Sequence, residues 1–71
     1  MIKPGIYRHY RGRQYGVIGI AKHSETLENL VIYEPLYESE TKFWARPEKM
    51  FLEEVEVEGR RVPRFEFIKT G

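Results

Sequence analysis

Short runs of β-forming residues follow one another along the whole chain, separated by turn residues about every 8–12 positions. No apolar periodicity of the helical kind persists through the sequence. The predicted strands are residues 6–10, 14–23, 30–35, 43–46, 54–58 and 64–67. This spacing predicts an all-β fold, a small and partly open barrel of five or six antiparallel strands.

The clearest pattern lies near the C-terminal end. Residues 54–58 alternate strictly between glutamate and valine, so the valines should face inward and the glutamates should face water. We expect Gly59 to turn the chain and residues 64–67 to return as the partner strand. Arg60, Arg61 and Arg64 would then lie opposite the glutamate row and form cross-strand charge pairs.

Glycine and proline positions shape the rest of the sheet. Gly16 and Gly19 in the longest run predict a bend or bulge that curls the sheet. Pro47 predicts a 3₁₀ turn over residues 47–51, because proline favours the first position of a helical turn. The predicted order of elements is four strands, a proline-led turn and then a closing strand. This order is similar to that of Src-homology-3-like barrels.

The 71 residues form a single domain, 1–71, and 41% of them are apolar, enough for a core. The chain has no cysteine, which excludes disulfides and thiolate metal sites and favours the reducing cytosol. We predict a cytoplasmic protein without a signal segment. No membrane partner is expected, because the longest apolar stretch, residues 16–21, is far shorter than a span of roughly 20 residues.

Charge is unevenly distributed. Residues 1–22 carry five basic residues and no acidic one, and residues 23–59 carry ten glutamates against three basic residues. Residues 60–71 carry four basic residues against one glutamate. If the terminal strands pair, the two basic ends share one face. The patch is modest for a nucleic-acid binder, so mutual salt bridging is the favoured interpretation.

Several motifs resemble a known family along nearly the whole chain. They are residues 4–10 (PGIYRHY), 21–28 (AKHSETLE), 31–33 (VIY), 36–37 (LY), 44–47 (WARP), 50–51 (MF) and 62–65 (VPRF). The chain resembles the small bacterial proteins of domain of unknown function family 1653. This resemblance implies a small barrel-like fold and no established activity.

His9 and His23 are the two histidines, and a metal site would need both together with carboxylates such as Glu25. We favour the interpretation that His23 bonds its own loop, and we predict no metal and no cofactor. Ser24 follows His23 directly, and neighbours on a strand point to opposite faces, so the two make a poor nucleophile and base. The sequence therefore leans away from an enzyme.

Tyrosine and tryptophan are more numerous than a core of this size needs, and their polar ends prefer water. Such residues either line a groove on a small barrel or close the barrel, with their hydroxyls bonded to loops. The predicted binding residues are Tyr7, His9, Tyr15, His23, Glu25, Tyr33, Tyr37, Trp44 and Arg46.

The leading functional hypothesis is a small non-enzymatic binding module that recognises a peptide or protein partner through an aromatic groove. One alternative is a nucleic-acid-binding accessory protein that uses the basic first and last strands. Another is a metabolite-binding or small enzyme site around His23, Glu25 and Arg46. An open edge strand could also pair with a second copy of the chain.

Overall fold

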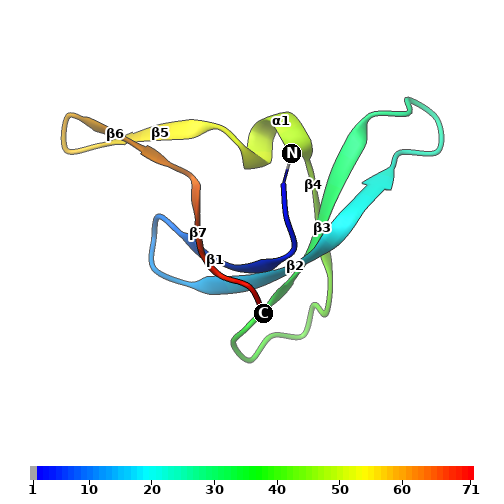
Figure 1. The fold of residues 1–71 in the computed structure, drawn as a ribbon, viewed down its shortest axis with the longest axis horizontal. Coiled ribbons are helices and arrows are strands. Elements are labelled where there is room, and N and C mark those ends of the chain that lie inside the picture. Colours follow the sequence, from blue (N-terminus) through cyan, green and yellow to red (C-terminus); the bar gives the residue numbers. More distant parts are fainter. Residues whose placement is uncertain (1) are drawn as a thin grey trace.

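The computed structural model describes residues 2–71. Within this range the elements are β1 (Gly5–His9), β2 (Gln14–Lys22), β3 (Asn29–Pro35), β4 (Trp44–Pro47), α1 (Glu48–Phe51), β5 (Glu54–Val57), β6 (Arg60–Pro63) and β7 (Phe65–Lys69). One antiparallel sheet has the order β4-β3-β2-β1-β7, and β5 and β6 form a separate hairpin (Figure 1). The all-β prediction is confirmed. The sheet stays open, because its edge strands β4 and β7 do not pair with each other.

A bulge in β2 curves the sheet. The pairing of β2 with β3 shifts register between Val17 and Gly19, so Ile18 is the extra residue. Because of this shift, Val17 and Ile20 lie opposite Tyr33 and Val31 on the same face of the sheet. The bend predicted from the two glycines of β2 is therefore confirmed.

The core lies on the concave face of the sheet, beneath α1. Its buried residues are Ile2, Tyr7, Val17, Val31, Tyr33, Phe51 and Phe65. Phe51 of α1 stacks on Phe65 of β7, with ring centroids 4.1 Å apart and planes at 4°. The α1 turn thus closes the open side of the sheet with one aromatic ring.

The C-terminal hairpin is confirmed, but its predicted return strand is wrong. Glu54–Val57 pairs with Arg60–Pro63, and Glu58 and Gly59 make the turn with φ of 52° and 78°. Residues 65–69 leave the hairpin and pair with β1 instead. Pro63 is the last residue of β6, and the Arg64 N–H still donates to the Glu53 carbonyl oxygen before the chain continues into β7.

The predicted 3₁₀ turn is an α-helical turn. The Leu52 N–H donates to the Glu48 carbonyl oxygen at 3.0 Å, which is the four-residue spacing of an α-helix. A three-residue bond follows from the Glu53 N–H to the Met50 carbonyl oxygen at 3.3 Å, so the 3₁₀ character is confined to the end of the turn. Among residues 2–71, no helix is long and apolar enough to cross a membrane.

Candidate functional site

The inner face of the sheet carries a band of aromatic residues from one edge to the other. The register places Trp44 of β4 opposite Tyr33 of β3, and Tyr15 of β2 opposite Tyr7 of β1. At the other edge, His9 lies opposite Phe65 of β7. Paired residues point to the same side of a sheet, so these side chains share the concave face. We call this band the aromatic face.

Two of the predicted binding tyrosines belong to the core. Tyr7 and Tyr33 are 7% and 4% exposed. The Tyr7 hydroxyl donates to the Lys3 carbonyl oxygen at 2.8 Å, and the Tyr33 hydroxyl accepts from Arg46 at 3.3 Å. Both polar ends are thus satisfied within the fold. These two rings close the sheet rather than line an open groove.

The other predicted rings are more open to solvent. Tyr15 and Tyr37 are half-buried, and their hydroxyls share a hydrogen bond of 3.1 Å. Burial, together with this bond, raises the pKa of Tyr15 to about 12, so the phenol stays protonated. The Arg13 guanidinium lies 4.4 Å from the Tyr37 ring centroid. Trp44 is 43% exposed and is the most open ring of the aromatic face.

Arg46 extends from β4 over the aromatic face. It lies opposite Val31, on the same side of the sheet as Trp44. Its Nε donates to the Tyr33 hydroxyl, and its guanidinium carbon lies 5.7 Å from the Phe65 ring centroid. Arg46 is therefore held between a phenol and an aromatic ring, both of them uncharged partners.

Arg64 lies where the hairpin meets the main sheet. Its N–H donates to the Glu53 carbonyl oxygen and its own carbonyl oxygen accepts from the Tyr10 N–H, both at 2.9 Å. Its side chain is 22% exposed and its Nη2 contacts the Glu53 carboxylate at 3.1 Å. Its Nε is buried and makes no hydrogen bond within residues 2–71. A buried donor left without a partner costs about 1–3 kcal/mol.

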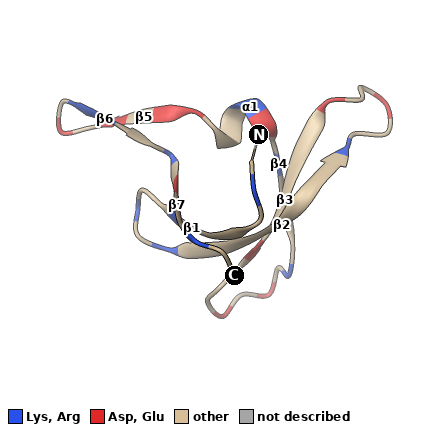
Figure 2. Cartoon of the chain, viewed as in Figure 1, with Lys and Arg blue, Asp and Glu red and all other residues tan. Residues whose placement is uncertain are grey.

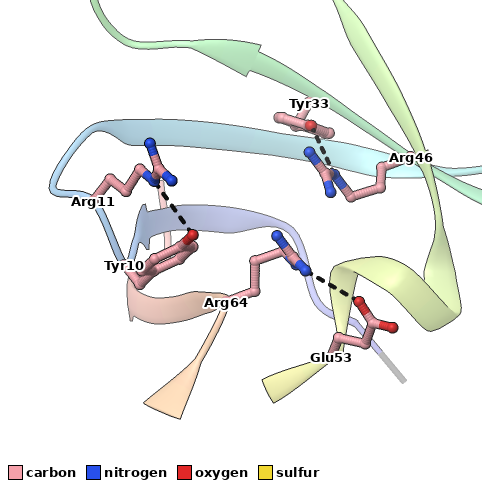
Figure 3. A network of polar contacts seen from close by, with 6 residues as sticks. All are labelled: Tyr10, Arg11, Tyr33, Arg46, Glu53 and Arg64. Atoms are coloured by element: carbon pink, nitrogen blue, oxygen red, sulfur yellow. Dashed lines mark hydrogen bonds and ion pairs between the residues drawn. The ribbon is translucent and has the colours of Figure 1, made fainter. Parts of the chain in front are cut away.

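His9 joins these arginines at the end of β1. Its ring packs against Phe65 at 4.9 Å and Tyr10 at 4.5 Å between centroids. Its Nδ1 accepts from the Arg11 N–H at 3.2 Å, which leaves the proton of the neutral ring on Nε2. Burial, and then the positive charges of Arg46, Arg64 and Arg11, lower the pKa of His9 from 6.5. Figure 3 shows Arg46 and Arg64 extending from opposite sides into the same region. We call His9, Arg46 and Arg64 the cationic centre.

The His9 environment gives a pH-dependent prediction. We expect His9 to titrate below its ordinary pKa of 6.5, because burial and the neighbouring arginines disfavour the imidazolium. Its contribution to the free energy of unfolding is then complete above pH 6.5 and is lost as pH falls through the lowered pKa. NMR of the ring signals measures the midpoint. Arg46→Gln should raise it, whereas Arg8→Gln, on the opposite face of β1, should not. A wild-type midpoint at or above 6.5 would contradict the prediction.

A groove opens beside the cationic centre, between the β1–β2 turn and the β5–β6 hairpin. Its volume is about 320 Å³. The lining residues are Arg8, His9, Tyr10, Gly12, Val57, Val62, Pro63 and Glu66. His9 thus belongs both to the aromatic face and to this hairpin groove, whose hairpin side is apolar.

His23 and Glu25 lie away from the cationic centre, in the loop between β2 and β3. The His23 Nδ1 accepts from the N–H groups of Glu25 and Thr26 at 3.1 and 3.3 Å, so its ring fixes the loop. This loop follows the end of β2 (Figure 1), whereas Arg46 of β4 lies opposite Val31, which in turn lies opposite Ile20 of β2. The bonds of the His23 ring thus stay within its own loop, and the site predicted around His23, Glu25 and Arg46 stays a prediction.

Basic residues of β1 and β6 form ion pairs with carboxylates of β7 and β5. Arg8 contacts Glu66 at 3.0 Å, and Arg61 contacts Glu54 at 3.2 Å. Figure 2 shows the basic segments of the β1–β2 turn and of β6 separated by acidic segments of β5 and β7. This arrangement favours the mutual salt bridging expected from the sequence over one continuous basic face for nucleic acid.

Sequence reasoning missed two contributors to the site, Arg64 and Arg11. Arg64 was predicted to form a charge pair with a glutamate across the hairpin, and it does contact Glu53, but its place at the junction of β6 and β7, beside Arg46 and His9, was not predicted. Nothing in the local sequence marks Arg11, which reaches the centre through its bonds to His9 and Tyr10.

The comparisons with known proteins agree with this architecture. The family model described as "Protein of unknown function (DUF1653)" matches residues 5–67. The chain is also similar to the crystal structure of a DUF1653 protein from Bordetella bronchiseptica, with 32% sequence identity and a TM-score of 0.91. That match covers 99% of this chain and 91% of the other. The search of curated proteins gave no match. Because the family match spans most of the chain, and a solved member shares the fold, this protein belongs to the DUF1653 family.

Proposed function

We propose that the protein is a small non-enzymatic binding module that recognises an extended peptide segment of a partner protein through its aromatic face. The observation that carries the proposal is the position of Trp44. It is 43% exposed, whereas Tyr33, which lies opposite it on β3, is buried. Tryptophan in such a place provides a large contact area at low entropic cost, as at the centres of protein interfaces.

The strand that carries Trp44 supports a peptide as the ligand. β4 is an edge of the sheet and has β3 as its single neighbour among residues 2–71. An edge strand offers unpaired backbone groups, and an extended peptide can pair with them as an added strand. Trp44 and Arg46, two residues apart on β4, would then contact alternate side chains of the peptide.

The polar groups of the site favour binding over catalysis. The one histidine of the cationic centre uses Nδ1 to accept the Arg11 N–H. A general base needs a free nitrogen aimed at a substrate proton and a positioned partner, and a nucleophile needs such a base beside it. The arginines and phenols of this site supply charge and hydrogen bonds instead.

We also place this function in the bacterial cytosol. A chain without cysteine has none of the disulfides that small secreted domains usually need. The likeness to a protein from the bacterium Bordetella bronchiseptica supports the bacterial part of this assignment.

Selection from a displayed random peptide library tests the proposal. We expect enriched peptides whose affinity falls at least about tenfold in Trp44→Ala, equivalent to about 1.4 kcal/mol. The matched control is Phe43→Ala, because Phe43 is the adjacent aromatic residue, lies outside the strand and is 60% exposed. Peptides that bind both variants equally would contradict the aromatic face as the binding surface. Steeply salt-dependent binding to single-stranded RNA or DNA, without peptide enrichment, would favour the nucleic-acid alternative.

A further inference from the structure

Three arginines from different parts of the chain act by their charge on one histidine at the end of the aromatic face. Arg11 comes from the β1–β2 turn, Arg46 from β4 and Arg64 from the junction of β6 and β7. Each contributes a positive charge that acts on His9. Like charges held close together are unfavourable unless a counter-charge lies among them. Whether carboxylates of the protein neutralise these three arginines therefore determines whether the site can bind an anion.

The partners of these arginines leave that charge largely uncompensated. Arg11 and Arg46 donate to the phenol oxygens of Tyr10 and Tyr33 at 3.2 and 3.3 Å, and neither phenol carries a charge (Figure 3). Within residues 2–71, the carboxylate paired with the three arginines is that of Glu53, on Arg64 at 3.1 Å. Two guanidinium charges thus lack an anionic partner in this part of the chain.

Arg64 also has donor capacity to spare. Glu53 engages one nitrogen, Nη2, while the adjacent Nε is buried and unpartnered. A guanidinium presents Nε and Nη as a fork that matches the two oxygens of a carboxylate or phosphate. The Glu53 side chain is 54% exposed, whereas that of Arg64 is 22% exposed. The bond to Glu53 is therefore one that solvent and competing anions can reach.

We propose that the cationic centre of His9, Arg46 and Arg64 is an oxyanion site, which takes a carboxylate or phosphate group carried by the bound peptide, and that Glu53 occupies part of this site when the peptide is absent. This inference deepens the proposed function and rests on it for the source of the anion. The aromatic face binds the body of the peptide, and the cationic centre fixes its register by holding one anionic group.

Small anions test the site without any peptide. Inorganic phosphate and acetate, compared with sodium chloride at equal ionic strength, are titrated into labelled protein while NMR follows the His9 ring and the Arg46 and Arg64 side-chain N–H signals. We expect saturable shifts with both oxyanions and none with chloride. Arg46→Gln, with its backbone spectrum preserved, should weaken phosphate binding at least about fivefold. Equal shifts with chloride and with oxyanions would overturn the proposal.

Two neighbouring glutamates give a matched test of the role of Glu53. Glu53→Gln removes the internal competitor and should tighten phosphate binding about fivefold. Glu54→Gln makes the same change of charge at a carboxylate that is also 54% exposed, but whose partner is Arg61. This variant should bind phosphate as the wild type does. If phosphate affinity increased equally in the two variants, the cause would be the change in net charge. That result would overturn the role of Glu53 as an internal competitor.

Peptides then distinguish the sources of the anion. The peptides selected on the aromatic face are compared with an amidated C-terminus, with each acidic residue changed to its amide and with a phosphoserine in its place. Loss of affinity on one of these changes identifies the group that fills the site. Selected peptides that bind tightly without any anionic group, and equally well to Arg46→Gln, would overturn the oxyanion site and leave the proposed function intact. Phosphate binding without any selected peptide would support the oxyanion site and overturn the proposed peptide-binding function.

Discussion

Phe51→Ala should lower the free energy of unfolding by about 3–5 kcal/mol, the range for truncating a buried phenylalanine. Phe51 is 2% exposed and stacks on Phe65 at 4.1 Å, and it meets the edges of Tyr7 and Tyr33 at 5.5 and 5.6 Å. Its ring is the piece of α1 that covers the concave face. A chain of 71 residues has a total stability of about 4–11 kcal/mol, so this one change removes a large fraction of it.

Urea denaturation followed by tyrosine and tryptophan fluorescence measures the effect. Phe43→Ala is the matched control, because it removes the same atoms from a residue that is 60% exposed. We expect that control to change the free energy of unfolding by less than about 0.5 kcal/mol, as most surface substitutions do. Equal losses in the two variants would contradict the role of Phe51 as the ring that closes the sheet.

The strands could be predicted because their signals are local. Alternation of glutamate and valine over residues 54–57 matches the burial found there, with half-buried valines and exposed glutamates. Gly16 and Gly19 indicated the bulge of β2, and Gly59 indicated the hairpin turn. Each of these signals lies within a few residues of the feature it predicts, so no knowledge of distant contacts was needed.

The errors arose where pairing between distant strands decided the structure. Residues 65–69 alternate as well as a hairpin strand would, yet they pair with β1 at the other end of the chain. Alternation fixes which face a residue occupies, but it does not identify the neighbouring strand. The helical turn shows the same limit, because a short proline-led segment is compatible with both three- and four-residue bonding.

The candidate site was predicted in its residue types more than in its geometry. The surplus of tyrosine and tryptophan predicted either an aromatic groove or rings that close the barrel, but their spacing did not separate buried Tyr7 and Tyr33 from exposed Trp44. Arg46 was included for its sequence neighbour Trp44, and the register places both on that face. Arg64 was missed because its position depends on where the hairpin ends.

Gly5→Ala is the second substitution with a large expected effect, and its cause is steric. Gly5 has φ of +148°, where residues with a side chain are strained at a cost of about 1–3 kcal/mol. A Cβ there would lie 2.6 Å from the Lys69 carbonyl oxygen and 2.9 Å from Cε1 of Phe67. The oxygen belongs to the β7 backbone and cannot turn aside, so β7 has to move away from β1. Crowding of this kind adds about 1–3 kcal/mol.

Gly12→Ala separates the two causes. Gly12 also has a positive φ, +108°, but a Cβ there has no neighbour within 4 Å. Its substitution therefore carries the backbone cost alone, whereas Gly5→Ala carries the crowding as well. The denaturation midpoint of Gly5→Ala should fall clearly below that of Gly12→Ala, with NMR shift changes concentrated in β1 and β7. Equal midpoints would mean that β7 accommodates the methyl group, and that the pairing of the two terminal strands does not depend on glycine at this position.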